Sequence, residues 1–167
     1  YLKDNGQAGI SFFIKDATSG SWDMYAVEAN SSADTIKLVK WVGGTRTEIA
    51  TTNFTFAPGQ ILWLGADFKD YDADEGRLKV YASLQEGNLI KAENLIISEQ
   101  DPQWLGSAGG SVGILSYQVN TRFVNFIAGS PEHAETSDVS FSLDGPVLGP
   151  LVFSLGEVYK RAGDRVQ

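Results

Sequence analysis

Short runs in which apolar and polar residues alternate are the feature that most limits how this chain can fold. The clearest run covers residues 61–71 and holds one unbroken apolar row, made of Leu62, Leu64, Ala66 and Phe68. Successive side chains of a β-strand point to opposite faces, so such a run has one face for a core and one for its surroundings. The three- and four-residue spacing of an amphipathic helix is nearly absent, which favours an all-β chain.

Runs of this kind recur between clusters of turn residues along most of the sequence. The nine predicted strands are residues 9–15, 23–29, 35–42, 45–51, 61–71, 77–84, 111–119, 122–128 and 139–143. Gly43 and Gly44 predict a two-residue hairpin turn, because glycine adopts positive φ without a steric clash. Nine antiparallel strands in one compact domain predict two packed sheets, that is, an antiparallel β-sandwich.

The sequence changes character after residue 129. Residues 1–129 are expected to form the sandwich core, and residues 130–167 a loop-rich extension that packs on the same domain. Within the extension, Ser154 and Glu157 have the spacing of a capping box, which predicts a short C-terminal helix. The chain begins at Tyr1 without a leader-like segment, so we expect it to be part of a larger protein.

Composition excludes several classes of function. The 167 residues include 13 Lys and Arg against 21 Asp and Glu, a net charge of −8, which opposes binding to nucleic acid phosphates. The chain has no Cys and one His, which rules out disulfides, thiol nucleophiles and metal sites built from several imidazoles. No apolar run is long enough to predict a membrane span.

The order and spacing of these runs resemble those of the concanavalin A-like jelly roll, as found in laminin G-like and carbohydrate-binding modules. The segments that carry the resemblance are residues 9–14, 25–28, 36–41, 63, 78–81, 110–114 and 123–127. The resemblance implies a curved two-sheet sandwich that binds glycans on its concave face or rim loops, commonly with one structural calcium ion. Many such domains are not enzymes. Phe123, Val124 and Asn125 depart from the Phe-Asp-Asn pattern of the family, so its calcium-binding Asp is not carried over.

Catalytic motifs are missing. Jelly-roll glucanases carry a Glu-x-Asp-x-x-Glu strand, whereas Glu28, Glu48 and Glu75 are isolated in their segments. His133 lies in a polar stretch, and no Gly-x-Ser-x-Gly nucleophile elbow is present. These absences predict that the chain is not an enzyme.

A cluster of acidic residues follows the strand at 61–71. Asp70, Asp72 and Asp74 alternate along the chain just before Gly76, and a tight loop would bring their oxygen atoms together around Ca²⁺. The spacing does not match an EF-hand loop. Two interpretations stay open: a calcium site, and a solvated hairpin whose Asp, Glu and Gly residues serve turn formation and solubility.

Aromatic residues on the outward rows point to sugar binding. The apolar C–H faces of sugar rings stack on flat aromatic side chains, while their hydroxyl groups pair with charged and amide groups. Alternation places Trp41 and Trp63 outward, where they could contact a ligand. The polar or aromatic partners expected near them are Glu28, Lys37, Asp67, Lys69 and Tyr71.

Together these patterns predict a non-catalytic, lectin-like carbohydrate-binding module of a larger secreted or cell-surface protein. Its expected partners are a glycan or polysaccharide and the other domains of the parent protein. One alternative is a laminin G-like adhesion or structural domain that binds protein. Another is a polysaccharide lyase or glycoside hydrolase whose catalytic residues come from separate strands.

Overall fold

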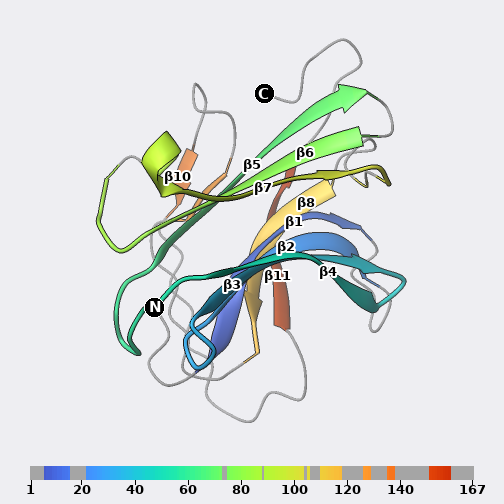
Figure 1. The fold of residues 1–167 in the computed structure, drawn as a ribbon. Coiled ribbons are helices and arrows are strands. Elements are labelled where there is room, and N and C mark those ends of the chain that lie inside the picture. The colour runs from blue at the N-terminus through green and yellow to red at the C-terminus, as the bar shows by residue number, and fades with distance from the viewer. Residues whose placement is uncertain are drawn as a thin grey trace.

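The computed structural model describes residues 6–15, 22–72, 75–87, 89–103, 105, 110–117, 126–128, 135–137 and 151–158 (Figure 1). The regular secondary structure of this part of the chain is almost entirely β-strand. The strands are β1 (Gln7–Lys15), β2 (Asp23–Asn30), β3 (Thr35–Val42), β4 (Thr45–Asn53), β5 (Trp63–Asp72), β6 (Glu75–Ser83), β7 (Leu95–Asp101), β8 (Gly110–Ser116), β9 (Phe126–Ala128), β10 (Glu135–Ser137) and β11 (Leu151–Val158). One three-residue 3₁₀ helix, η1 (Ala92–Asn94), lies before β7, and no described helix is long and apolar enough to cross a membrane.

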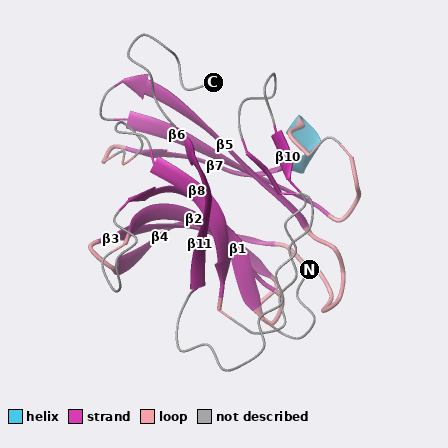
Figure 2. Cartoon of the chain, turned by 180° about the vertical axis from the view of Figure 1, so that it is seen from behind, coloured by secondary structure: helices cyan, strands magenta, loops and turns pink. Residues whose placement is uncertain are grey.

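Two antiparallel sheets pack face to face (Figures 1 and 2). The larger sheet has six strands in the order β11-β8-β1-β2-β3-β4, and the smaller has three in the order β5-β6-β7. β9 and β10 pair with each other in a separate two-stranded sheet. The predicted all-β, two-sheet antiparallel sandwich is therefore confirmed.

The hairpin predicted at Gly43 and Gly44 is confirmed as well. Val42 pairs directly with Thr45, so the two glycines form the whole connection between β3 and β4. Their φ angles are 56° and 79°, the left-handed region in which glycine carries no Cβ penalty. Two positive φ angles match the right-handed twist of the flanking strands.

The predicted C-terminal helix is wrong. The segment that carries Ser154 and Glu157 lies in β11, which pairs with β8 along the edge of the larger sheet (Figure 2). Gly156 lies at a register shift opposite Val112, a position that tolerates glycine better than a helix interior does. The six-stranded sheet therefore takes an edge strand from beyond residue 129.

β7 was not predicted, and its burial pattern explains why. Ile97 and Asp101 are the buried residues of this edge strand, whereas Ser98, Glu99 and Gln100 between them are exposed. The sequence therefore lacks a sustained apolar alternation. The strand predicted at 139–143 lies outside the described residues.

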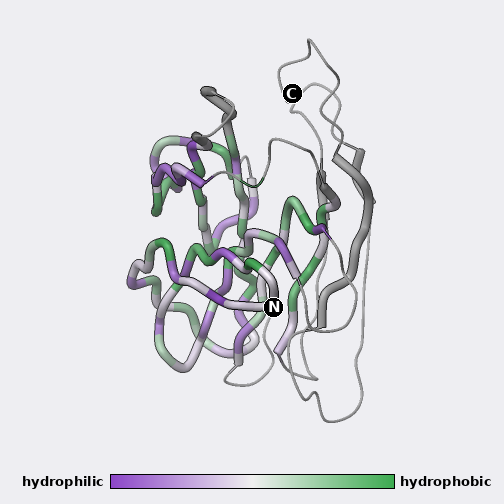
Figure 3. The backbone as a smooth tube through the Cα atoms, turned by 90° about the vertical axis from the view of Figure 1, so that its right-hand side faces the viewer, coloured by the Kyte–Doolittle hydropathy of each residue, from purple (hydrophilic) through white to green (hydrophobic). Residues whose placement is uncertain are grey.

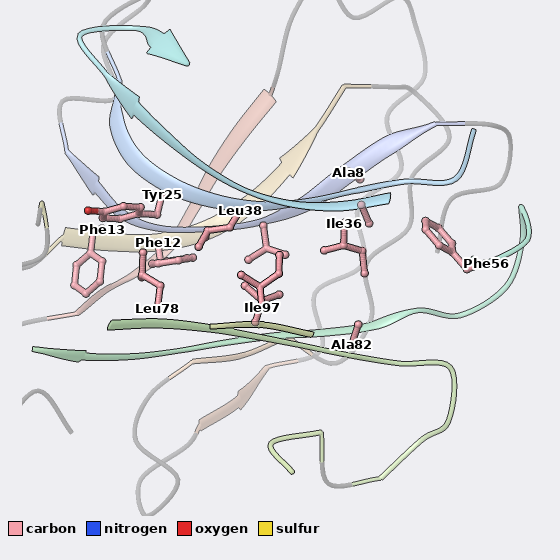
Figure 4. Packing of buried hydrophobic residues seen from close by; sticks show 13 residues of the cluster. Ala8, Phe12, Phe13, Tyr25, Ile36, Leu38, Phe56, Leu78, Ala82 and Ile97 are labelled. Carbon is pink, nitrogen blue, oxygen red and sulfur yellow. The ribbon is translucent and has the colours of Figure 1, made fainter. Parts of the chain in front are cut away.

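The core lies between the two sheets, where apolar rows from both meet (Figure 4). Figure 3 shows the same alternation as hydrophobic and hydrophilic stretches that follow one another along the chain. Ile36, Leu38 and Tyr25 of the larger sheet are fully buried, as is Val80 of the smaller. Val42 has the same place in the strand alternation as Ile36 and Leu38, yet it is 49% exposed because it borders the hairpin turn.

A β-bulge in β1 brings two consecutive aromatic residues into the core. Phe13 has a φ of 54°, and the register of β1 shifts against both of its neighbours near this residue. Phe12 stacks on Tyr25 (Figure 4). The Phe13 ring meets Phe68 of the other sheet edge-on at 4.4 Å between centroids. The bulge breaks the alternation that would otherwise turn Phe13 outward.

A buried polar cluster, here called the inter-sheet latch, joins the sheets through Lys40, Asp101 and Tyr25. Lys40 Nζ lies 2.7 Å from Asp101 Oδ2, and the Tyr25 hydroxyl donates to the same oxygen at 2.6 Å. Lys40 also donates to the Gln103 carbonyl oxygen. Burial and the bond to Asp101 raise the pKa of Tyr25, so this hydroxyl remains a donor. The latch connects β2 and β3 to the end of β7.

Candidate functional site

The predicted ligand-binding residues fall on two separate faces of the sandwich. Glu28, Lys37 and Trp41 lie on β2 and β3, on the side of the six-stranded sheet that faces away from the core, here called the outer face. Trp63 and Asp67 lie on β5, in strand positions opposite to those of its core residues Leu64 and Phe68. Alternation alone predicted both sets to be outward, but the sheets place them on opposite sides.

The outer face belongs to a curved sheet. Figure 4 shows the strands of the larger sheet bending away from the smaller sheet toward both ends, so the outer face is the concave side. Trp22, Trp41 and Tyr117 are partly buried on this side. They pack against a buried apolar layer formed by Ile14, Met24, Ala26, Val39 and Leu115.

Glu28 is the buried charge at the centre of the polar groups on the outer face. Its side chain has no exposed surface, and both of its carboxylate oxygens accept hydrogen bonds. Arg46 Nη2 and Gln7 Nε2 donate to Oε2 at 2.6 and 2.7 Å, and the Tyr117 hydroxyl donates to Oε1 at 2.7 Å. A buried carboxylate is stable only when it is paired and hydrogen-bonded in this way.

Arg46 links Glu28 to the region of Trp41. It lies on β4 directly opposite Trp41, yet its guanidinium reaches Glu28 on β2, so its side chain must cross the outer side of β3. The hydrogen bond and charge of Glu28 raise the pKa of Arg46 despite its partial burial. Burial and the charge of Glu28 also raise the pKa of Tyr117, which keeps its phenol protonated.

A second, more exposed ion pair lies beside the first. Lys37 Nζ and Glu48 Oε2 are 2.7 Å apart, and their side chains are 33% and 37% exposed. Lys37 is the direct cross-strand neighbour of Glu28, so the two ion pairs adjoin each other. The surface over β3 and β4 therefore presents both charges and several donors.

Trp41 is held next to Trp22 by the hairpin. The two rings are 5.9 Å apart between centroids and inclined at 60°. Asp23 Oδ1 accepts a hydrogen bond from the Gly43 amide at 2.7 Å, and the Gly44 amide donates to the Trp22 carbonyl oxygen. These bonds tie the tip of the hairpin to the start of β2 and so place both indoles.

The other predicted residues lie on the three-stranded sheet. Trp63 is partly buried, and Asp67 is exposed opposite Lys79. Between them, Gly65 is covered by Leu89, because a Cβ atom at this position would come within 2.8 Å of the Leu89 side chain. Lys69 and Tyr71 continue β5 toward its end.

The calcium prediction for the acidic residues stays a prediction. Asp70 and Asp72 belong to β5, where they pair with Gly76 and Glu75, and Asp74 lies outside the described residues. Within the described ranges, no three His, Asp or Glu side chains gather closely enough to hold a metal ion. Thermal unfolding in excess Ca²⁺ against EDTA, with Asp72→Ala as the control variant, tests the prediction.

Several outer-face residues were not predicted from the sequence. Arg46 and Glu48 could have been found, since a two-residue turn at Gly43 and Gly44 fixes which residues of β4 face Trp41 and Val39. Gln7 reaches Glu28 from β1 and Tyr117 reaches it from just after β8, and no local pattern reveals such distant contacts.

Comparisons with known proteins add no relatives. The chain matches no protein-family model, no curated protein and no solved structure. The functional argument therefore rests on the outer face itself.

Proposed function

We propose that this chain is a non-catalytic carbohydrate-binding module, similar to concanavalin A-like lectins, in a larger secreted or cell-surface protein. The observation that carries the proposal is the position of Trp41 on the outer face, directly opposite Arg46 and on the same side of β3 as Lys37, which forms an ion pair with Glu48. A sugar ring would stack on the indole, and its hydroxyl groups would bond to the charged groups.

The chemistry of these residues suits a sugar. Trp41 is partly exposed, and the Arg46, Lys37 and Glu48 side chains keep about a third of their surface in solvent. Sugar-binding sites combine a flat apolar surface with a few fixed donors and acceptors. Because Glu28 and the hairpin hold Arg46 and Trp41 in place, little side-chain entropy would be lost on binding.

The same geometry disfavours catalysis at the outer face. A glycoside hydrolase needs an acid and a second carboxylate, whereas Glu28 accepts three close hydrogen bonds and Glu48 is paired with Lys37. A lyase could use Tyr117 as a base, but the raised pKa of this phenol opposes its deprotonation. Glu28 and Tyr117 are therefore better suited to positioning Arg46 than to transferring protons.

A second candidate function is protein binding through the three-stranded sheet. Four large apolar residues near one end of this sheet are exposed: Ile61, Leu84, Ile90 and Leu95. Leu95 pairs with Tyr81, and Ile90 lies over Gly65, which is the other cross-strand neighbour of Tyr81. Such a patch is typical of a protein interface, and it would favour the laminin G-like alternative.

Binding measurements on two tryptophan variants test the proposal. Wild type is screened on a glycan array and on immobilised plant, algal and bacterial polysaccharides, and the ligands found are measured by titration calorimetry. Trp41→Leu keeps an apolar side chain over Met24 and Val39 but removes the stacking ring, so we expect at least about a tenfold loss of affinity. Trp63→Leu is the matched control on the opposite face and should bind as wild type does.

The outcomes separate the candidates. Loss of binding in Trp63→Leu alone would move the site to the three-stranded sheet. A blank screen for folded wild type, with and without Ca²⁺, would overturn the proposal. Turnover of any polysaccharide would instead establish the enzyme alternative.

A further inference from the structure

We infer that Glu28 makes the outer face selective for uncharged glycans over acidic ones. The inference rests on the proposed function and deepens it by naming the class of ligand. Glu28 acts here as a positioning and specificity-determining residue, because it holds and neutralises Arg46 from beneath without facing the solvent itself.

The charge of Arg46 is already matched inside the protein. Its Nη2 and Nε atoms lie 2.6 and 3.4 Å from the two Glu28 oxygens, and the carboxylate is fully removed from solvent. Charges interact more strongly in such a low-dielectric position than in water, so a ligand carboxylate in solvent competes poorly with Glu28. Displacing Glu28 would also break its bonds to Gln7 and Tyr117.

The second cation on the outer face is matched as well. Lys37 is paired with Glu48 at 2.7 Å, so each of these two cations has its own anion on the same face. Asp23, which anchors the hairpin tip, adds a further negative charge near Trp22. The net charge of −8 on the whole chain adds long-range repulsion of a polyanion.

Hydrogen bonding to neutral hydroxyl groups remains available. A guanidinium has five N–H donors in a fixed plane, and the two bonds to Glu28 use two of them. A sugar hydroxyl can accept a hydrogen bond from one of the other N–H groups of Arg46 without displacing Glu28 from its ion pair. Glu28 thus converts Arg46 from an anion receptor into an oriented donor.

Removal of one negative charge tests the inference. Glu28→Gln keeps the shape of the side chain and an oxygen that Tyr117 and Arg46 can donate to, but leaves Arg46 with an unmatched charge. Binding is measured to a neutral polymer from the screen and to polygalacturonate at two salt concentrations. Wild type should prefer the neutral polymer, and Glu28→Gln should gain about tenfold in affinity for polygalacturonate at low salt.

Two further variants complete the design. Glu48→Gln frees Lys37 on the exposed part of the same face, and it should produce a smaller gain in polygalacturonate binding without the risk of disturbing a buried group. Glu99→Gln on β7 removes the same charge from an exposed position on the other sheet, and it should produce no gain. The gains should disappear at high salt, because a solvent-exposed charge is screened.

The possible results distinguish failure of the charge selectivity from failure of the proposed function. If wild type binds polygalacturonate as tightly as the neutral polymer, or if folded Glu28→Gln and Glu48→Gln show no gain, the charge selectivity is wrong while the proposed function stands. If Glu28→Gln unfolds, Glu48→Gln against Glu99→Gln decides the question. If wild type binds neither polymer class, the proposed function and the inference both fail.

Discussion

At the scale of single residues, Asp101 shows how costly an unpaired buried charge would be in this sandwich. Lys40 and Asp101 are each only 8% exposed, and the latch that they form joins the two sheets. Asp101→Ala would leave the Lys40 ammonium buried without a counter-ion, so we expect a loss of about 3–5 kcal/mol in the free energy of unfolding. Urea unfolding measures this loss.

The Lys37–Glu48 pair provides the matched comparison for that prediction. It has the same length as the Lys40–Asp101 pair, but its side chains are about a third exposed, whereas those of the Lys40–Asp101 pair are buried. Glu48→Ala should therefore cost less than about 1 kcal/mol. Equal losses in the two variants would show that the latch contributes no more than a surface ion pair.

The inter-sheet latch also predicts how the free energy of unfolding depends on pH. Burial alone would raise the pKa of Asp101, but the hydrogen bonds from Lys40 and Tyr25 lower it more, so the net pKa lies below the usual value. The unfolded carboxyl takes up a proton near pH 4, where the folded one does not, so the stabilisation is complete above about pH 4 and is lost at lower pH. Urea midpoints measured from pH 7 to pH 2 should fall less steeply for Asp101→Asn than for wild type.

At the scale of elements, the β3–β4 hairpin places both Trp41 and Arg46. A Cβ atom on Gly43 would meet nothing within 4 Å, so the cost of a substitution comes from its φ of 56° alone. Gly43→Val should lower the free energy of unfolding by about 1–2 kcal/mol, whereas Gly43→Asn should cost less because Asn tolerates this region. Thermal unfolding compares the two, and equal losses would rule out backbone conformation as the cause.

The elements also show what could be predicted from the sequence. The alternation of apolar and polar residues identified β1 to β6 and β8, and the pair Gly43 and Gly44 identified one turn. Both signals depend only on residues that are neighbours in the sequence. Alternation also gave the outward direction of Trp41 and Trp63. It could not assign β3 and β5 to different sheets, because that assignment depends on contacts between distant strands. The two tryptophans therefore cannot share the single site that the sequence suggested.

Contacts between distant strands also decided two features that the local sequence does not show. The spacing of Ser154 and Glu157 matches a capping box, which predicts a helix. The segment instead forms β11, because pairing with the edge of β8 satisfies its backbone hydrogen bonds. Glu28 has no second carboxylate near it in the sequence, and it is surrounded by donors because Gln7 of β1, Arg46 of β4 and Tyr117 just after β8 reach it. Tertiary contacts decided both outcomes.

At the scale of the whole molecule, the outer face depends on the integrity of the six-stranded sheet. β8 carries Leu115 in the buried outer layer and is followed by Tyr117, the donor to Glu28. β11 pairs with β8 over its whole length, from Leu151 opposite Ser116 to Val158 opposite Gly110. Without β11, the backbone groups on that side of β8 would lose these partners.

Truncation tests this dependence directly. A chain ending at residue 158 keeps all of β11, and a chain ending at residue 150 lacks it. The shorter chain should melt at a lower temperature, by about 2–4 °C for every kcal/mol lost, and should bind the glycan less tightly because Tyr117 would no longer be held within hydrogen-bond distance of Glu28. Equal melting and binding by the two chains would show that the edge strand supports neither the sandwich nor the outer face.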